Sequence, residues 1–162
     1  MEKENFLDST DLQILEQLQR DASLSNQDLA HKVHTSPPTC LRRVKRLREI
    51  GVIERQIALL NTDRLASLLG AGLTALVEVT LDRQDSAAME AFEARIAPDI
   101  AVQQCYRVSP GPDFVCVIHA SDMPGYLALT QRLFTSDANV RNVKAFFSVK
   151  RVKFEPVVAL AR

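Results

Sequence analysis

The fold of this chain is decided by the stretch SPPTCLRRVKRLREIG, residues 36–51. It predicts a helix from about Pro38 to Ile50, because proline is tolerated in a first turn and Gly51 suits the position after the last turn. At about 100° per residue, one side of this helix is apolar, with Cys40, Val44 and Leu47. The opposite arc carries Thr39, Arg42, Arg43, Lys45 and Arg46. Five of the seven residues from Arg42 to Arg48 are basic and none is acidic, so the outer face is cationic.

Two further helices are predicted before this one. The first runs from about Ser9 to Arg20, with Asp8 as N-cap, and the second begins after Ser25. A cationic helix placed second in a helix-turn-helix lies in the major groove of DNA, where arginine reaches guanine and other polar groups contact phosphates. The residues that we expect to contact DNA are Ser25, Asn26, Ser36, Thr39, Arg42, Arg43, Lys45 and Arg46.

A basic helix taken alone is more often a solvated surface than a binding site. The whole chain has 20 basic and 20 acidic residues, which gives no net attraction to nucleic acid. The distribution of charge matters more, since a basic stripe on one face suffices to meet phosphates. Here the charge is of one sign and lies within a helix-turn-helix pattern, followed at residues 52–60 by extended segments typical of a minimal wing and a linking strand. The combination favours double-stranded DNA as a partner.

The second half of the chain changes to strand periodicity. Alternation and helical spacing predict the order β-α-β-β-α-β, the ferredoxin-like arrangement of an α+β protein. The strands are expected over residues 73–81, 101–108, 114–120 and 143–154, with helices over about 88–96 and 122–134. We expect a winged helix-turn-helix domain over 1–56, a linker strand or hinge over 57–70, the ferredoxin-like domain over 71–155 and a tail over 156–162.

The sheet of this domain is predicted to be covered on both faces. Residues 114–118 are apolar at every position, and Phe146 and Phe147 are adjacent, so that one ring points to each face. A bare apolar sheet face usually marks an interface. The pattern therefore indicates a homo-oligomer.

Composition is that of an ordinary globular protein, with 46% apolar and 25% charged residues among 162. No run is long and apolar enough to span a bilayer, and the N-terminus lacks the pattern of a secretory signal, so we expect a cytoplasmic protein without a membrane partner. Cys40, Cys105 and Cys116 form no CxxC pair, and neither a disulfide framework nor a metal site is predicted. We expect no catalytic residues and no cofactor.

Several stretches of the chain together resemble the leucine-responsive regulator/asparagine regulator (Lrp/AsnC) family of transcriptional regulators. They are residues 7–15, 25–30, 36–44, 51–53 and 58–61. The resemblance extends over essentially the whole chain and implies a winged helix-turn-helix joined to a ferredoxin-like effector domain. It also implies dimers that assemble further, often to octamers, and an amino acid or related small molecule as effector.

The resemblance also suggests where an effector binds. The family commonly has Gly-x-x-Asp-Tyr at the turn between the middle strands, and this chain has SPGPDF at 109–114, with the glycine one place later and two prolines added. The family's frequent Pro-Gly-Val is replaced by Asp137-Ala138-Asn139-Val140. The candidate effector residues are Ser109, Gly111, Asp113, Phe114, Thr135 and Ser136. Asp113 is equally well explained as a residue that caps its turn, and Thr135 and Ser136 as a helix end.

Two other classes of function remain as alternatives. A ferredoxin-like domain can host catalysis, but the sequence has no nucleophile–base pairing, phosphate loop or metal cluster. RNA-recognition modules share this fold and expose stacking aromatics on their sheet, which Phe146 and Phe147 resemble superficially. The Gly-aromatic-Gly-Phe context of such modules is missing.

Overall fold

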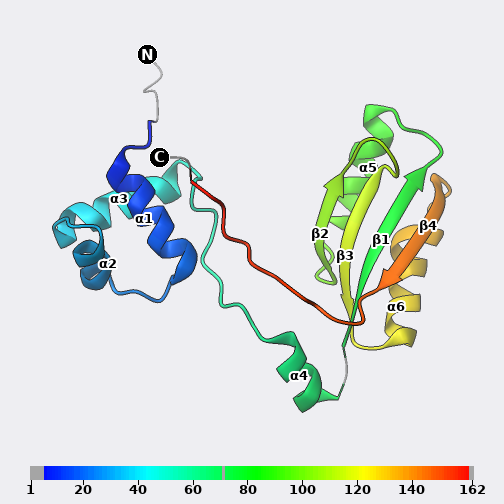
Figure 1. Cartoon of the computed structure of the whole chain (residues 1–162). Coiled ribbons are helices and arrows are strands. Elements are labelled where there is room, and N and C mark those ends of the chain that lie inside the picture. Colours follow the sequence, from blue (N-terminus) through cyan, green and yellow to red (C-terminus); the bar gives the residue numbers. More distant parts are fainter. Residues whose placement is uncertain (1–5, 71, 161–162) are drawn as a thin grey trace. The chain divides into compact units, whose positions relative to one another are not determined.

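A computed structural model describes residues 6–70 and 72–160, and the chain divides into two compact units (Figure 1). The helical unit consists of the residues up to Leu59 together with those from Lys153 onward. The sheet unit spans Leu60–Val152. The C-terminal residues therefore belong with the first half of the chain.

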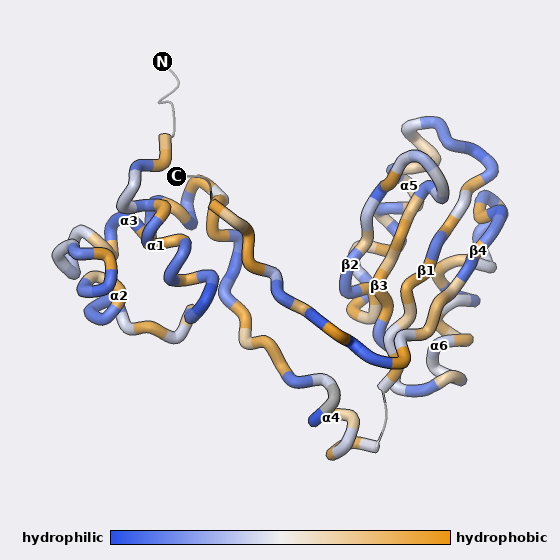
Figure 2. Tube along the Cα trace, viewed as in Figure 1, coloured by the Kyte–Doolittle hydropathy of each residue, from blue (hydrophilic) through white to orange (hydrophobic). Residues whose placement is uncertain are grey.

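The helical unit is built from α1 (Ser9–Arg20), α2 (Asn26–Lys32) and α3 (Pro37–Glu49). These helices begin where the sequence predicts, because the Asp8 side chain caps α1 and the Ser25 side chain caps α2. Their apolar faces meet in one core, and in Figure 2 orange apolar residues alternate with blue polar ones along these helices. The buried residues of this core are Ile14, Leu15, Leu29, Ala30, Val33, Cys40, Val44 and Leu47.

A buried carboxylate at Asp11 joins the start of α1 to α3. Asp11 is 0% exposed and forms a capping box with Asp8, in which each backbone N–H donates to the other's carboxylate at 2.9 and 3.2 Å. Arg43 Nη1 donates to Asp11 Oδ1 at 2.9 Å and to Asp8 Oδ2 at 2.7 Å. Arg46 Nη2 donates to Asp11 Oδ2. Two guanidinium groups of α3 are thereby fixed on one end of α1.

The turn between α2 and α3 sets the position of α3. His34 has φ +52°, in the left-handed region that closes a tight helix-to-helix turn, and the Asn26 side-chain amide donates to the Pro37 carbonyl at 2.9 Å. At the other end, Gly51 with φ +76° ends α3. The Ile53 N–H then donates to the Leu47 carbonyl at 3.0 Å.

The linker differs from the extended segment expected over 57–70. Residues 54–61 form no strand, and Thr62–Leu69 form a helix, α4. Asn61, which the sequence pattern suggested only as punctuation, is its N-cap and accepts from the Arg64 N–H at 3.0 Å. Leu68 and Leu69 are exposed on this short helix.

The sheet unit has the predicted order of elements. They are β1 (Leu73–Leu81), α5 (Ser86–Ile96), β2 (Val102–Arg107), β3 (Phe114–Ala120), α6 (Met123–Thr130), a π-helical turn (Gln131–Thr135) and β4 (Val140–Phe147). The strands lie in the order β2-β3-β1-β4 and every pair is antiparallel. Both helices cover one face (Figure 1). The α+β, ferredoxin-like prediction is confirmed.

The two faces of this sheet differ. Alternate residues of β1 and β3, such as Val77 and Cys116, are buried against Phe92 and Phe134 of the helical layer. On the other face Leu76 lies opposite Phe146, and both are more than two-fifths exposed. The next residue, Phe147, lies opposite the buried Ala75. Its ring packs edge-on against the Tyr126 ring, with the ring centroids 4.9 Å apart. The adjacent rings therefore lie on opposite faces, as the sequence predicted.

The last strand is shorter than the expected 143–154 and begins earlier. Val140 already pairs with Leu81. The strand ends at Phe147 because its partner β1 begins at Leu73, and only the Ser148 N–H still reaches the Thr74 carbonyl, at 2.8 Å. Residues beyond it have no strand to pair with.

The C-terminal segment from Lys153 packs within the helical unit instead of forming a separate tail from residue 156. The Gln19 amide binds both polar groups of the Val158 backbone, accepting from its N–H at 2.7 Å and donating to its carbonyl at 3.2 Å. Leu160 packs against the helical core. This segment is therefore part of the unit that carries α3.

Replacing Asp11 with asparagine tests the link between α1 and α3. The amide keeps the size of the side chain but removes the charge that two arginines share, and it places donors against donors. We expect the unfolding free energy of the helical unit to fall by about 2–4 kcal/mol, somewhat less than for a wholly buried pair because both arginines are partly exposed. Urea unfolding followed by far-UV circular dichroism measures it.

Glu54→Gln is the matched control, because the Glu54 side chain is exposed and its carboxylate lies as far as 4.0 Å from the Arg55 guanidinium. It is expected to change stability by less than about 0.5 kcal/mol. Equal stability of the two variants would show that Asp11 does not hold the unit together.

Candidate nucleic-acid interface and ligand site

The outward face of α3 is basic, and Arg42 and Lys45 are its exposed basic residues. Arg42 is exposed and makes no ion pair with any residue in the described part of the chain. The side chain of Lys45 is 76% exposed, and its ammonium lies 3.8 Å from Glu49, a pair that solvent weakens. These two groups can meet an anionic partner without breaking a strong internal contact.

Arg43 and Arg46 are placed differently from the expectation of the helical wheel. Their guanidinium groups bind Asp11, and only 26% and 37% of the two side chains is exposed. Hydrogen bonds to Asp8 and then Asp11 raise the pKa of Arg43. The Asp11 N–H and then Arg43 hold the pKa of the Asp8 carboxyl below its usual value. Arg43 therefore mainly positions α3, whereas Arg46 keeps a larger part of its side chain exposed to solvent.

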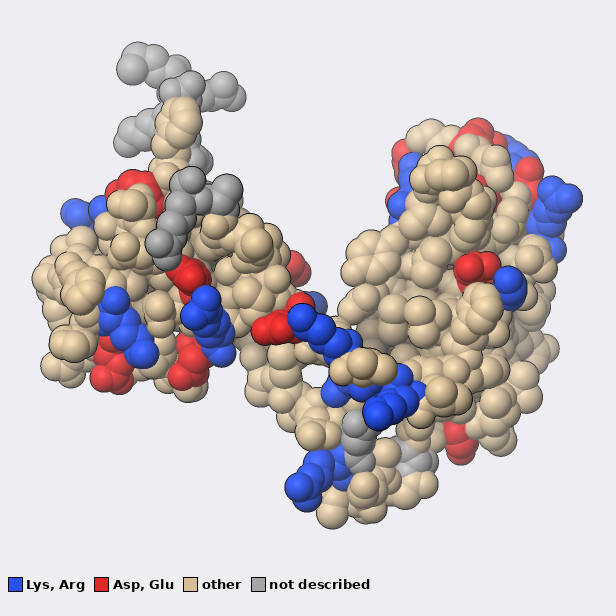
Figure 3. Space-filling model, viewed as in Figure 1, with Lys and Arg blue, Asp and Glu red and all other residues tan. Residues whose placement is uncertain are grey.

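A recess of about 370 Å³ lies where α3 meets the start of α1. It is lined by Phe6, Asp8, Asp11, Arg42, Arg43 and Arg46. The Nε of Arg43 is buried there without a hydrogen-bond partner among the described residues. In Figure 3 basic and acidic side chains are interspersed over the visible face of the helical unit, in keeping with a chain of zero net charge.

The polar residues at the helix starts divide into two groups. Ser25 accepts from the Asp28 N–H at 3.1 Å and Asn26 binds Pro37, so both hold the helix-turn-helix together. Ser36 makes no cap bond and donates instead to the Thr39 hydroxyl at 2.8 Å. Because α3 begins with two prolines, its first turn offers few N–H donors to a phosphate. Its affinity for anions must come mainly from side chains.

The proposed effector turn meets the end of β1. In an antiparallel sheet the end of β1 and the starts of β3 and β4 lie at the same edge. Asp113 is 8% exposed and its Oδ2 accepts from the Leu81 N–H at 2.7 Å and from the Gln84 amide at 3.2 Å. The Asp113 N–H donates to the Val79 carbonyl at 2.9 Å. Asp113 therefore ties its hairpin to another strand rather than capping its own turn.

The other candidate effector residues are not gathered around Asp113. Phe114 is fully buried and stacks on Phe92 at 4.5 Å between ring centroids, so it belongs to the core and not to a ligand surface. Ser109 and Gly111 are exposed at the turn. The hydroxyls of Thr135 and Ser136 donate to carbonyls of the preceding turn at 3.5 and 3.0 Å, as helix-end residues do.

Sequence reasoning missed Gln84 at this site. Gln84 follows β1 in a short polar loop, and no sequence motif identifies it as a site residue. Its contact with Asp113 arises only when β1 and β3 pair. The Asp82 N–H, from the same loop, donates to the Asn139 carbonyl at 2.9 Å. The loop after β1 thus connects the starts of the two neighbouring strands.

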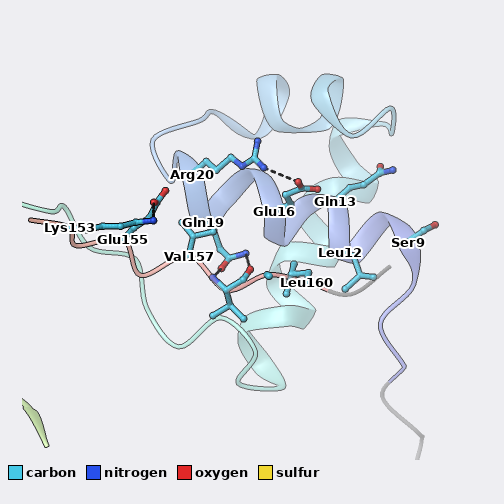
Figure 4. A pocket seen from close by; sticks show the side chains of 12 residues that line it. Ser9, Leu12, Gln13, Glu16, Gln19, Arg20, Lys153, Glu155, Val157 and Leu160 are labelled. Atoms are coloured by element: carbon cyan, nitrogen blue, oxygen red, sulfur yellow. Dashed lines mark hydrogen bonds and ion pairs between the residues drawn. The ribbon is translucent and has the colours of Figure 1, made fainter.

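A groove of about 780 Å³ lies elsewhere, between α1 and the C-terminal segment (Figure 4). Its lining is Ser9, Leu12, Gln13, Glu16, Gln19, Arg20, Lys153, Glu155, Val157, Val158, Ala159 and Leu160. None of the residues predicted to bind DNA or an effector lines it. Arg20 and Glu16 form an ion pair at 3.0 Å along its rim.

The described residues contain no group of three or more His, Cys, Asp or Glu side chains that could hold a metal ion. No helix among residues 6–70 and 72–160 is long and apolar enough to cross a membrane.

Known proteins match both units. The winged helix-turn-helix DNA-binding family matches residues 7–54, and the Lrp/AsnC ligand binding domain matches residues 74–158. A leucine-responsive regulatory protein of Rhizobium meliloti is 37% identical over 147 residues, 91% of this chain and 92% of the relative. The protein of that name from Escherichia coli is 33% identical, with coverage of 91% and 87%.

Solved structures agree with these matches along the whole chain. A transcriptional regulator from Neisseria meningitidis in complex with L-Met has a TM-score of 0.81 at 28% identity and covers 95% of this chain and 97% of its own. An AsnC family transcriptional regulator from Agrobacterium tumefaciens also has a TM-score of 0.81, at 27% identity, with coverage of 94% and 97%. With a helix-turn-helix whose second helix is basic and a ferredoxin-like second unit, the chain belongs to the Lrp/AsnC family of transcriptional regulators.

Proposed function

We propose that this regulator reads double-stranded DNA with the outer face of α3. Arg42 and Lys45 supply the main contacts to base edges and phosphates. Thr39, Ser36 and the exposed part of the Arg46 side chain add to them. The observation that carries the proposal is the exposed, one-signed pair Arg42 and Lys45 on a helix that Asp11 fixes from behind. Arg43, Ser25 and Asn26 act by holding the reading helix in place. A regulator of this kind acts in the cytoplasm, where bacterial DNA lies.

The functional molecule that we propose is a homodimer formed through the open face of the sheet, which can assemble further to an octamer. Support comes from Leu76, Phe146 and Tyr106, apolar or aromatic side chains of that face that are each more than two-fifths exposed. Such a patch usually marks an interface. A dimer presents two copies of α3 to two half-sites and gains affinity by avidity.

RNA recognition by the sheet is less well supported. Phe146 and Phe147 lie on opposite faces, so they cannot form one platform on which neighbouring bases stack.

An amino acid is the effector that we propose, at the edge of the sheet beside Asp113. The Neisseria relative was solved with L-Met, and this edge offers matching chemistry. Both hydrogen bonds to the Asp113 side chain use Oδ2, which leaves Oδ1 to accept from an ammonium group. Ser109 and Gly111, exposed in the adjoining turn, can offer donors to a carboxylate, whereas the Thr135 and Ser136 hydroxyls already donate to carbonyls of their helix end. Bound between subunits, such a ligand shifts assembly only by its difference in affinity for the two states.

The DNA contact is tested with Arg42→Ala and Lys45→Ala. Loss of a base contact should cost about 1–3 kcal/mol of binding free energy and relax preference at one position, whereas loss of a phosphate contact should weaken all sequences and lower the salt slope by about one. Fluorescence anisotropy with a duplex from upstream of the chain's own gene, at several salt concentrations, gives both quantities. Arg141→Ala, which removes one exposed arginine from the sheet unit, is the control. Full operator affinity in the Arg42, Lys45 double variant would refute the assignment.

The effector site is tested with Asp113→Asn. The amide oxygen still accepts from the Leu81 N–H but carries no charge, so the affinity for an amino acid should fall at least about tenfold, the loss of one charged hydrogen bond. Calorimetric titration of wild type with a panel of amino acids, methionine and leucine included, identifies the ligand to use on the variant. DNA binding without ligand should be unchanged.

Asp122→Asn is the matched control, since asparagine caps α6 as well as aspartate does. Equal affinity of the Asp113 variant and wild type, or no binding by wild type, would make Asp113 a purely structural link between strands.

A further inference from the structure

Two cysteines that are eleven residues apart in the chain face each other on neighbouring strands of the sheet. Cys105 of β2 lies directly opposite Cys116 of β3 in the register of the hairpin. Both side chains belong to the helix-covered face, where Cys116 is fully buried and Cys105, on the edge strand, is partly exposed.

The hydrogen-bond pattern of this hairpin brings the two thiols close. Val108 donates to the Asp113 carbonyl at 3.0 Å, which makes residues 108 and 113 a hydrogen-bonded pair. Bonded and non-bonded pairs alternate along an antiparallel ladder, so Cys105 and Cys116, three steps further along, form a non-hydrogen-bonded pair. In such pairs the Cα atoms are about 4.5 Å apart and the side chains are close, within the range of about 4.4–6.8 Å that a disulfide spans.

The pKa values of the two thiols shift in opposite directions. The hydrogen bond from the Cys116 thiol lowers the pKa of Cys105, although burial and the nearby Glu93 oppose it. The same hydrogen bond, with burial, raises the pKa of Cys116. Cys105 is therefore the thiolate-forming and more accessible sulfur, and a partially exposed thiolate is the one that oxidants attack.

We propose that Cys105 and Cys116 form a redox modification site, in which a hydroperoxide oxidises Cys105 and Cys116 resolves it to a disulfide. The cross-link closes the hairpin that carries the turn at 109–113.

The chemistry balances in two steps. The Cys105 thiolate attacks the terminal oxygen of the peroxide. The O–O bond breaks, and the alkoxide or hydroxide that leaves takes up a proton, so sulfur is oxidised to a sulfenic acid. The Cys116 sulfur then gives up its proton and attacks the Cys105 sulfur, and the hydroxyl group departs as water. Two thiols and one hydroperoxide give one disulfide, one alcohol (or water) and one water.

Peptide mapping tests this on the full chain. The reduced protein is treated with hydrogen peroxide, then denatured and alkylated, and digested without reductant. Trypsin cuts after Arg95, Arg107 and Arg132, so the two cysteines fall on separate peptides, 96–107 and 108–132. The expected product is one joined pair of these peptides, which a thiol reductant separates. Recovery of Cys105 as sulfinic acid with Cys116 alkylated, or of both as alkylated thiols, would overturn the proposal.

Variants distinguish the site from general oxidation. Cys40→Ala should form the same joined pair, because Cys40 lies in the core of the helical unit. Cys105→Ser, at a partly exposed position, should yield no joined pair containing Cys116. In Cys116→Ala the thiolate of Cys105 loses its donor, so iodoacetamide should alkylate native Cys105 several-fold more slowly at neutral pH. An unchanged rate in folded Cys116→Ala protein would show that the thiols do not interact.

Discussion

The buried carboxylate of Asp11 is the contact on which the placement of α3 depends. It takes the backbone N–H of Asp8 and two guanidinium groups of α3, and so it sets both where α1 begins and how α3 lies against it. A buried charge is costly unless it is fully paired, so a carboxylate with three donors has few alternative arrangements. Arg43 and Arg46 both bind Asp11, so the basic groups of this face that are most exposed are Arg42 and Lys45, with Arg46 only partly exposed.

The sheet unit depends on a different constraint, the register between β1 and its two neighbours. That register places Asp113 at the end of β1 and Leu76 opposite Phe146, while the neighbouring β2–β3 ladder places Cys105 opposite Cys116. The two β1 ladders thus account for the proposed ligand site and the apolar face, and the β2–β3 ladder accounts for the thiol pair. A shift by one residue would exchange the faces of every side chain, which explains why the buried positions of β1 and β3 are uniformly apolar.

Local signals predicted the elements well, and contacts between elements were the part that sequence could not supply. The start of α1 follows from the Asp8 and Asp11 capping pair, which is readable within four residues. The wheel of α3 identified the outward arc correctly but treated Arg43 as free, because its partners lie 32 and 35 residues away. The spacing of Cys105 and Cys116 has no meaning until the hairpin register is known. Phe114 matches the family's aromatic position, yet its ring points into the core, since alternation along β3 decides its side.

The central claim is that two copies of α3, held by Asp11 and joined through the sheet, read two half-sites of one operator. Hydroxyl-radical footprinting of the full chain on the region upstream of its own gene tests this most directly. The account predicts two protected patches on one side of the duplex, about 10 bp apart from centre to centre or a multiple of that spacing. Protection without preferred positions, or none at concentrations where the chain is folded and dimeric, would contradict it.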